Sequence, residues 1–176
     1  LKERVSRFSN IWIEGVSAEA VEETRKSLPG VATPHKDFWH IGWIAMKMVA
    51  VEMAIKKFGQ GALLVDADLV FTGRIPSIEW DADLVLSRHS APARQSVEIS
   101  AGMFNAGMIL FRDRLVVNRW RELFATGRGG FYEQGCLSDL SREFVSSEFP
   151  PDWNWGCWRG EDLAISGRRP LTVHIH

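Results

Sequence analysis

The sequence predicts an α/β fold in which helices flank a mixed, mostly parallel sheet. Apolar runs of strand length alternate with longer segments whose apolar residues recur at helical spacing. The run from Gly61 to Val65 is continuously apolar, which is typical of a strand buried in a parallel sheet. Asp66 and Asp68 follow this run, and ligands bind beyond the carboxyl ends of the strands in such folds.

The first half of the chain is expected to contribute a strand and two helices before that run. Phe8 to Ile13 has strand character, and a helix opens at Ser17 with early acids and ends at Pro29-Gly30. In the second helix, apolar residues recur at helical spacing through Phe58, at Trp43, Met46, Val49, Ala50, Met53 and Ala54. Gly59 ends it.

The second half is expected to continue the alternation. Asp83 to Ser87 and Met108 to Phe111 are short apolar segments that predict strands. Val116 to Thr126 and Glu133 to Phe144 predict helices, with glycines between them. Leu171 to Ile175 predicts a last strand, so the chain should fold with right-handed crossovers around one sheet.

Composition indicates one domain over residues 1–176. The chain is 45% hydrophobic, which is enough to form a core. A net charge of -1 with both signs interspersed argues against a nucleic-acid or membrane surface, so a small-molecule partner is expected. No apolar stretch approaches the roughly 20 residues that span a bilayer. Cys136 and Cys157 are too few for a disulfide scaffold or a zinc site, which favours a reducing, cytoplasmic location.

The Asp66-Ala67-Asp68 segment suggests a divalent metal site. Two carboxylates this close to an apolar strand are costly to bury without a counter-charge, and hard oxygen ligands select Mg²⁺ or Mn²⁺. Alternatively, both aspartates solvate the strand end and cap a turn. The same pentapeptide recurs at 81–85, but there it precedes a strand, so Asp81 and Asp83 are expected at the opposite edge of the sheet.

Eight tryptophans are unusual for this length, and three of them lie in one short stretch. Trp153, Trp155 and Trp158 surround Asn154, and aromatic faces stack on sugars while amides bond hydroxyls, so this stretch could line a carbohydrate pocket. The alternative is core packing. Core packing is the expectation for the tryptophans in apolar stretches, namely Trp12, Trp39, Trp43, Trp80 and Trp120.

Four motifs, in this order, resemble those of the GT-A nucleotide-diphospho-sugar glycosyltransferases. They are the Lys47 helix with the Asp66-Ala67-Asp68 strand, Phe104 to Arg112, Tyr132 to Gly135, and Val173 to His176. The likeness is closest to the retaining, galactosyltransferase-like families and runs from about Trp39 to the end. It implies a nucleotide-sugar donor, most often a UDP-sugar, a carbohydrate or glycoconjugate acceptor, and Mn²⁺ or Mg²⁺.

The resemblance also implies a role for each matching residue. Asp66, Asp68 and His174 would hold the metal, although His176 lies on the same strand face and is an alternative to His174. Both histidines could instead belong to a surface tail. Acceptor contacts would come from variable loops such as 91–100 and the stretch of Trp153, Asn154 and Trp155.

The donor would contact Lys47, Asp66, Ala67, Asn105, Ala106 and Gly107. Asn105 would bond sugar hydroxyls, unless it only forms a turn, and Lys47 would offset diphosphate charge, unless it is a snorkelling surface lysine. The catalytic pair would be Glu133 and Gln134, where the family has Asp-Gln, which leaves the sugar open. An inverting reaction would need Glu133 or Asp152 as base, so the stereochemistry also stays open.

Two departures and two rival functions accompany this resemblance. The chain begins at what matches the second strand of the family, and it stops before the glycine and lysine that follow the metal histidine. A haloacid-dehalogenase-like phosphatase would use Asp66 as nucleophile and Asp68 as acid-base group, but it also needs a downstream lysine, and none follows Lys57. A non-catalytic, degenerate sugar-nucleotide-binding domain is the other alternative.

Overall fold

The computed structural model describes residues 18–26, 38–59, 61–74, 81–89, 102–126, 133–156, 167 and 169–175. Several predicted features lie outside these ranges, including the strand at 8–13, the loop at 91–100, Trp12, Trp80, Tyr132, Trp158 and His176. None of the described helices combines the length and the apolar composition that crossing a membrane requires.

Two helices open the described part of the chain. Helix α2 (Ala18–Lys26) packs against helix α3 (Phe38–Phe58). Gly59 follows α3 with φ 67°, and its N–H donates to the carbonyl oxygen of Ile55 at 2.9 Å. A left-handed residue is a common helix terminator that glycine adopts without steric cost, so the predicted end of this helix is confirmed.

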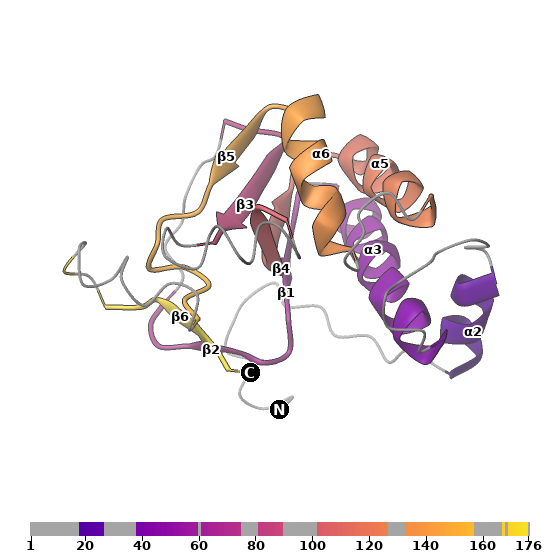
Figure 1. The fold of residues 1–176 in the computed structure, drawn as a ribbon, viewed down its shortest axis with the longest axis horizontal. Helices are drawn as coiled ribbons and strands as arrows, with labels where there is room; N and C mark the ends of the chain where they lie inside the picture. The colour runs from indigo at the N-terminus through magenta and orange to yellow at the C-terminus, as the bar shows by residue number, and fades with distance from the viewer. Residues whose placement is uncertain are drawn as a thin grey trace.

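The main sheet has four strands in the order β1-β4-β3-β5. They are β1 (Ala62–Val65), β4 (Phe104–Phe111), β3 (Leu84–Arg88) and β5 (Ser146–Glu148). Strand β4 is antiparallel to both of its neighbours, whereas β3 and β5 are parallel. Therefore β1, β3 and β5 run in one direction and β4 runs against them, which confirms a mixed sheet (Figure 1). The prediction of mostly parallel pairing is wrong, because β4 inserts between β1 and β3 and makes two of the three neighbouring pairs antiparallel.

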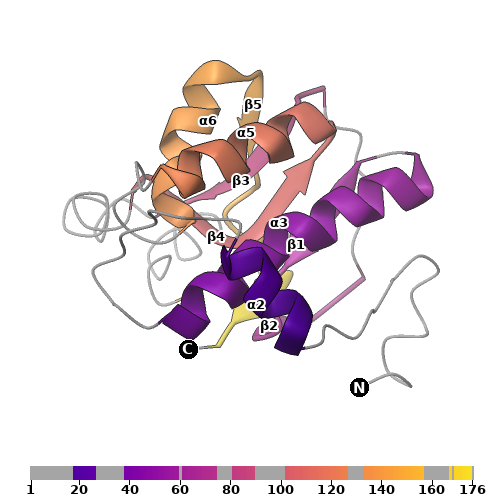
Figure 2. The same cartoon turned by 90° about the vertical axis from the view of Figure 1, so that its right-hand side faces the viewer.

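Helices cover one face of this sheet (Figures 1 and 2). Helix α5 (Arg114–Ala125) lies beside α3, and α6 (Leu137–Glu143) follows the 3₁₀ turn η1 (Gln134–Cys136). Sheet side chains that point toward these helices form the larger core cluster with α3, α5 and α6, and they include Leu84, Leu86, Ile109 and Phe111. The alternation of side chains along a strand sends Val85 and Met108 to the other face.

A two-stranded ribbon and a smaller core lie on that other side. Strand β2 (Leu69–Phe71) pairs antiparallel with β6 (Thr172–His174). The smaller core cluster consists of Leu69, Val85, Met108, Phe149 and Trp153. Phe149 and Trp153 stack with ring centroids 5.2 Å apart. The smaller core therefore joins the ribbon to the sheet through Leu69, and Figure 1 shows the ribbon beside the sheet.

Most predicted elements are confirmed, but several strands differ from the prediction. Strand β2 was not predicted, and β6 pairs with it in a separate two-stranded sheet instead of joining the one expected sheet. Strand β4 begins at Phe104 rather than Met108, so Asn105 lies in a strand and the turn interpretation is wrong. Strand β5 was not predicted, because its sequence Ser-Ser-Glu carries no apolar alternation. The second Asp-Ala-Asp segment lies at the opposite edge, as predicted, since Leu84 and Ala62 both pair with Phe111 at the far end of β4.

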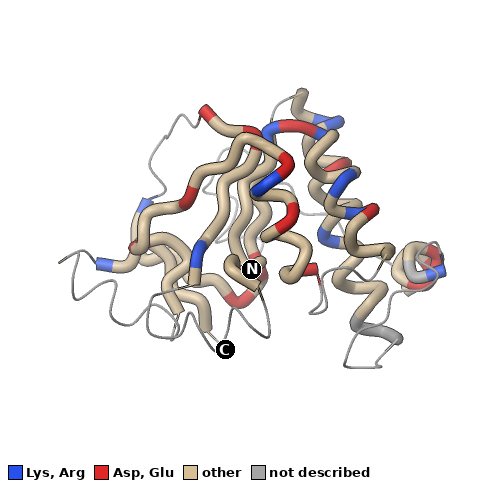
Figure 3. Tube along the Cα trace, turned by 45° about the horizontal axis from the view of Figure 1, so that its top comes forward, with Lys and Arg blue, Asp and Glu red and all other residues tan. Residues whose placement is uncertain are grey.

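Charged residues of both signs are interspersed on the described surface (Figure 3). Between α3 and α5, Glu52 accepts a hydrogen bond from Arg114 at 3.2 Å and pairs with Arg121. Hydrogen bonding from Arg121 is the main cause that lowers the pKa of Glu52, and burial opposes it. On the same helix layer, Arg119 pairs with Glu143 of α6 at 2.6 Å. These ion pairs tie the helices to one another at their solvent edge.

Candidate functional site

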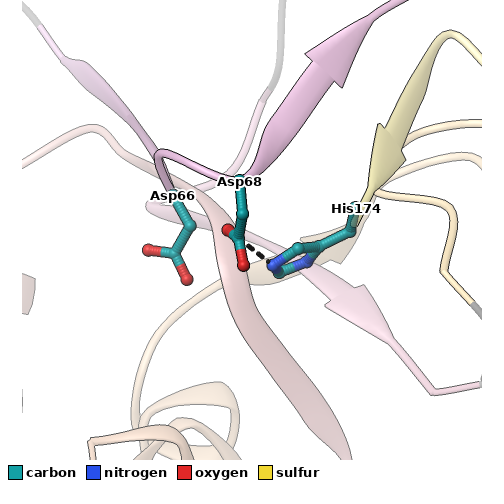
Figure 4. Close-up of side chains that lie close together, drawn as sticks. All are labelled: Asp66, Asp68 and His174. Carbon is teal, nitrogen blue, oxygen red and sulfur yellow. Dashed lines mark ion pairs between the residues drawn. The ribbon is translucent and has the colours of Figure 1, made fainter. Parts of the chain in front are cut away.

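Asp66 is positioned by the pairing of β1 with β4. It follows the last residue of β1, and its N–H donates to the carbonyl oxygen of Gly107 at 2.8 Å, which extends the ladder by one bond. The N–H of Leu69 then donates to the carbonyl oxygen of Asp66 at 3.1 Å and closes a tight turn. The turn brings Asp68 to the start of β2, on the same side of the sheet as Asp66 (Figure 4).

His174 is positioned by the pairing of β6 with β2. It lies opposite Leu69, and the N–H of Ile175 donates to the carbonyl oxygen of Asp68 at 2.9 Å. The His174 Nε2 atom is 2.9 Å from Asp68 Oδ1, and Figure 4 shows the imidazole directed at that carboxylate. The histidine side chain is 2% exposed and the aspartate side chain is 45% exposed, so the pair joins a fixed, buried group to a solvent-facing one.

The three predicted metal ligands meet at one point. Asp66, Asp68 and His174 each offer one ligand atom, and these atoms lie within 4.8 Å of one another. Two carboxylates and an imidazole are a donor set suited to Mn²⁺. The residues that the structure describes therefore include an Asp-Asp-His cluster with the composition and spacing of a metal site, and the surface-tail interpretation of His174 is wrong.

Gly107 leaves the space that the His174 ring occupies. A methyl group built on Gly107 would lie 2.2 Å from His174 Cε1, 2.6 Å from its Nδ1 and 2.9 Å from Asn105 Oδ1. Any larger residue would have to displace the ring. Gly107 was predicted to contact the donor, and its observed effect in this structure is to leave room for the histidine.

Asn154 completes the surroundings of His174, and it is the site residue whose position the sequence did not indicate. Its side chain is fully buried, its φ is 48°, and its backbone N–H donates to Thr172 Oγ1 at 2.6 Å. Its Nδ2 donates to Asn105 Oδ1 at 2.8 Å, and its Oδ1 lies 3.0 Å from His174 Nδ1. The sequence signal that could have indicated its backbone conformation is the residue type, because asparagine tolerates the left-handed region better than most other residues.

Lys47 links Asp66 to Glu133. Its Nζ lies 2.8 Å from Asp66 Oδ1 and 2.8 Å from Glu133 Oε1. Burial alone would lower the pKa of Lys47, but the Coulombic attraction of Glu133 and then of Asp66 outweighs it and raises the pKa. Lys47 therefore stays charged at neutral pH. The snorkelling interpretation is wrong, because the lysine side chain is 26% exposed and its ammonium group contacts both carboxylates.

The 3₁₀ turn places Gln134 against β4. Its Oε1 accepts a hydrogen bond from the N–H of Ala106 at 3.0 Å, and the preceding carbonyl of Glu133 accepts one from Trp120 Nε1 at 3.0 Å. The Glu133 side chain is 6% exposed. The predicted catalytic pair is thus joined to the donor motif by Gln134 and to the metal cluster by Lys47 and Asp66.

The predicted acceptor residues Trp153 and Trp155 differ in burial and in contacts. Trp153 is 4% exposed and stacks on Phe149, so it is a core residue rather than an exposed platform. Trp155 is half-buried and forms an isolated bridge with Val173. Among the other tryptophans, Trp120 is a core residue as predicted, whereas Trp43 is 52% exposed, which contradicts the prediction.

The fold, a mixed sheet flanked by helices, is similar to a GT-A glycosyltransferase fold. The chain is similar to mouse xyloside xylosyltransferase 1 in its apo crystal form, with a TM-score of 0.53 and 11% identity over 89% of this chain and 73% of that chain. No protein-family model matches the chain, and no curated protein does. At this identity the likeness shows the fold alone. The evidence for a candidate metal site comes from this chain's own Asp-Asp-His cluster.

Proposed function

We propose that this chain is a metal-dependent glycosyltransferase, which moves a sugar from a nucleotide-diphospho-sugar to a carbohydrate or glycoconjugate acceptor. The observation that carries the proposal is the Asp66, Asp68 and His174 cluster at the end of β1, within a GT-A-like fold. Ligand sites in open α/β sheets lie at this edge. The haloacid-dehalogenase-like alternative gains no comparable support from the fold.

The charge of the cluster supports a divalent cation. Asp66, Asp68 and Glu133 carry three negative charges, and Lys47 supplies one positive charge among them. With a neutral His174, these side chains carry a net charge of −2, which a divalent ion would balance. Bound there, Mn²⁺ or Mg²⁺ would supply the positive charge that a leaving nucleoside diphosphate requires.

The chain's own residues would have distinct roles toward the donor. Lys47 holds a permanent positive charge beside Asp66, where it would attract the diphosphate. Asn105 uses its Oδ1 within the protein, which leaves its Nδ2 group to donate to a sugar hydroxyl. Glu133 and Gln134, held by Lys47 and by Ala106, would stand beside the reacting sugar as the acid and amide of the transferase.

The first test is calorimetric titration of the chain with UDP, GDP and their sugars, with and without Mn²⁺. We expect metal-dependent binding of one nucleotide, and Asp68→Ala should abolish that dependence without unfolding the protein, because this side chain is 45% exposed. Asp81→Ala is the matched control, since it removes an exposed acid from the second Asp-Ala-Asp segment at the opposite edge. Equal nucleotide-sugar affinity in wild type and Asp68→Ala would refute the metal site.

A second measurement separates a transferase from a domain that only binds. A transferase without its acceptor is expected to hydrolyse its donor slowly when Mn²⁺ is present, and Glu133→Gln should reduce that rate. Release of free sugar from the nucleotide sugar, followed by chromatography, reports the reaction. Donor binding without any hydrolysis would instead support the degenerate binding domain.

A further inference from the structure

The hydrogen bonds that lead to His174 Nδ1 begin at a backbone N–H, a group that can donate but not accept. The backbone N–H of Gly107 donates to the side chain of Asn105 at 2.8 Å. A backbone amide nitrogen only donates, so the atom that it faces must be the oxygen of the Asn105 amide. The orientation of that amide is therefore fixed by the main chain of β4.

The amide of Asn154 is fixed in turn. It faces the same Asn105 Oδ1 at 2.8 Å, and an acceptor oxygen requires a donor, so the NH₂ group of Asn154 points there. Its own oxygen must then point the other way, at His174 Nδ1, 3.0 Å away. The side chain is fully buried, and its backbone N–H is held by Thr172 Oγ1, so the amide has little freedom to turn.

These hydrogen bonds determine which ring nitrogen of a neutral His174 carries the proton. Asn154 Oδ1 has no hydrogen to give, so Nδ1 must be the donor of that contact. A neutral imidazole with its proton on Nδ1 has its lone pair on Nε2. That atom is 2.9 Å from Asp68 Oδ1, and two electron-rich atoms at this distance repel each other unless a proton on Nε2 or a metal cation lies between them.

On the basis of the metal site proposed above, we infer that Asn154 and Asn105 are positioning residues for the metal. They hold neutral His174 in the Nδ1–H tautomer and so present the Nε2 lone pair to a divalent cation between His174 and Asp68. An outer-shell partner of this kind fixes the ring and the tautomer of a metal histidine. This role adds to the sugar contact proposed for Asn105, and it replaces the acceptor contact predicted for Asn154.

The direct test is nitrogen-15 NMR of the His174 ring in metal-free wild-type protein. The spectra are recorded at about pH 8.5, well above the usual histidine pKa of about 6.5. We expect a protonated Nδ1 and an unprotonated Nε2. A protonated Nε2, with or without a proton on Nδ1, would overturn the inference, and this measurement needs no variant.

Three variants then connect the tautomer to the metal. Asn154→Ala removes the acceptor, so both tautomers should appear and Mn²⁺ should bind roughly 10- to 100-fold more weakly. Asn105→Asp keeps an oxygen where Gly107 and Asn154 donate, so the wild-type tautomer should persist. Ser87→Ala removes another buried polar group, a hydroxyl that donates to the Met108 carbonyl, and should change neither readout.

The outcomes separate this inference from the proposed function. If wild-type protein does not bind Mn²⁺, the proposed function fails, and the assigned role fails with it. If wild type binds Mn²⁺ and Asn154→Ala binds it equally well, only the positioning role is overturned. A loss of stability common to Asn154→Ala and Ser87→Ala, with the wild-type tautomer kept in both, would likewise reduce Asn154 to a structural residue.

Discussion

The four-stranded sheet and the β2–β6 ribbon are stabilised in different ways. The sheet and its helices share a core of apolar side chains such as Leu84, Phe111 and Trp120, none of which is exposed. Around the ribbon, buried polar groups are prominent, with Asn154 and Thr172 at 0% and His174 at 6% exposure. Apolar burial depends on area and tolerates small shifts, whereas buried polar groups must keep their partners at hydrogen-bond distance.

The candidate metal cluster lies where these two regions meet. Asp66 extends a strand of the sheet, while Asp68 and His174 belong to the ribbon. Stability and site geometry should therefore respond to different substitutions in this molecule. Changes in the sheet layer should lower the free energy of unfolding, and changes on the ribbon side should first weaken the metal site.

The largest expected effect comes from the apolar region. Trp120→Ala removes a fully buried ring that stacks on Phe111 with centroids 5.1 Å apart, and it should lower the free energy of unfolding by about 3–5 kcal/mol. Denaturant titration measures this loss. Leu115→Ala, on the same helix at 66% exposure, should change it by less than about 0.5 kcal/mol. Similar losses in both variants would contradict the assignment of this core.

Gly107→Ala tests the boundary between the two regions. Its new methyl group would overlap the His174 ring, so the ring must move, at an expected cost of about 1–3 kcal/mol. Mn²⁺ affinity, measured by calorimetry, should fall at least 10-fold, about the smallest loss expected when a metal ligand's support is removed. Gly73→Ala is the control, because its methyl group would meet Leu171 at an ordinary 3.5 Å. Unchanged metal affinity in Gly107→Ala would mean that His174 is not a ligand.

Lys47→Met tests the polar groups beside the candidate metal cluster. It leaves Asp66 and Glu133 without their shared counter-charge, which should lower the free energy of unfolding by about 1–2 kcal/mol at this partial burial. Added Mn²⁺ should raise the melting temperature of this variant more than that of wild type, since the ion then neutralises the cluster. Lys56→Met, at an exposed position of the same helix, is the control. A smaller metal effect in Lys47→Met would show that the lysine supports the site.

The smallest effect is expected at the solvent edge of the helix layer. Glu52→Gln removes a carboxylate whose pKa is lowered from 4.5 by Arg121, and it should cost less than about 1 kcal/mol at neutral pH. A lowered pKa gives stability that is present above pH 4.5 and is lost as the pH falls through the folded value. The gap between wild type and Glu52→Gln in thermal unfolding should therefore close in acid. A gap that persists there would indicate lost packing instead of lost charge.

The sequence was sufficient to predict the features whose signals are local. The end of α3 at Gly59 depends on one left-handed glycine, and the placement of Asp66 depends on the apolar strand before it. Both signals lie within a few residues of the feature that they predict. The exposure of Trp43 was not predictable in this way, because α3 is apolar around much of its circumference and periodicity does not say which side faces the sheet.

The contacts that build the site were less predictable, because they join distant parts of the chain. Lys47 meets Glu133, and Asn154 meets both Asn105 and His174, only after the sheet and ribbon have formed. Residue types and the family resemblance indicated which side chains matter. They did not indicate that Asn154 faces the histidine, since this depends on a left-handed backbone conformation and on a neighbouring strand.

The pairing of β2 with β6 has a consequence for the order of folding. Leu69 and His174 are neighbours in the ribbon, although roughly 100 residues separate them along the chain, and closing so long a loop carries a large entropy cost. The cost falls once β1, β4, β3 and β5 have paired, because this pairing shortens the open loop between β2 and β6. The candidate metal cluster is therefore expected to form late in folding, and a nascent chain would acquire it only after His174 has been synthesised.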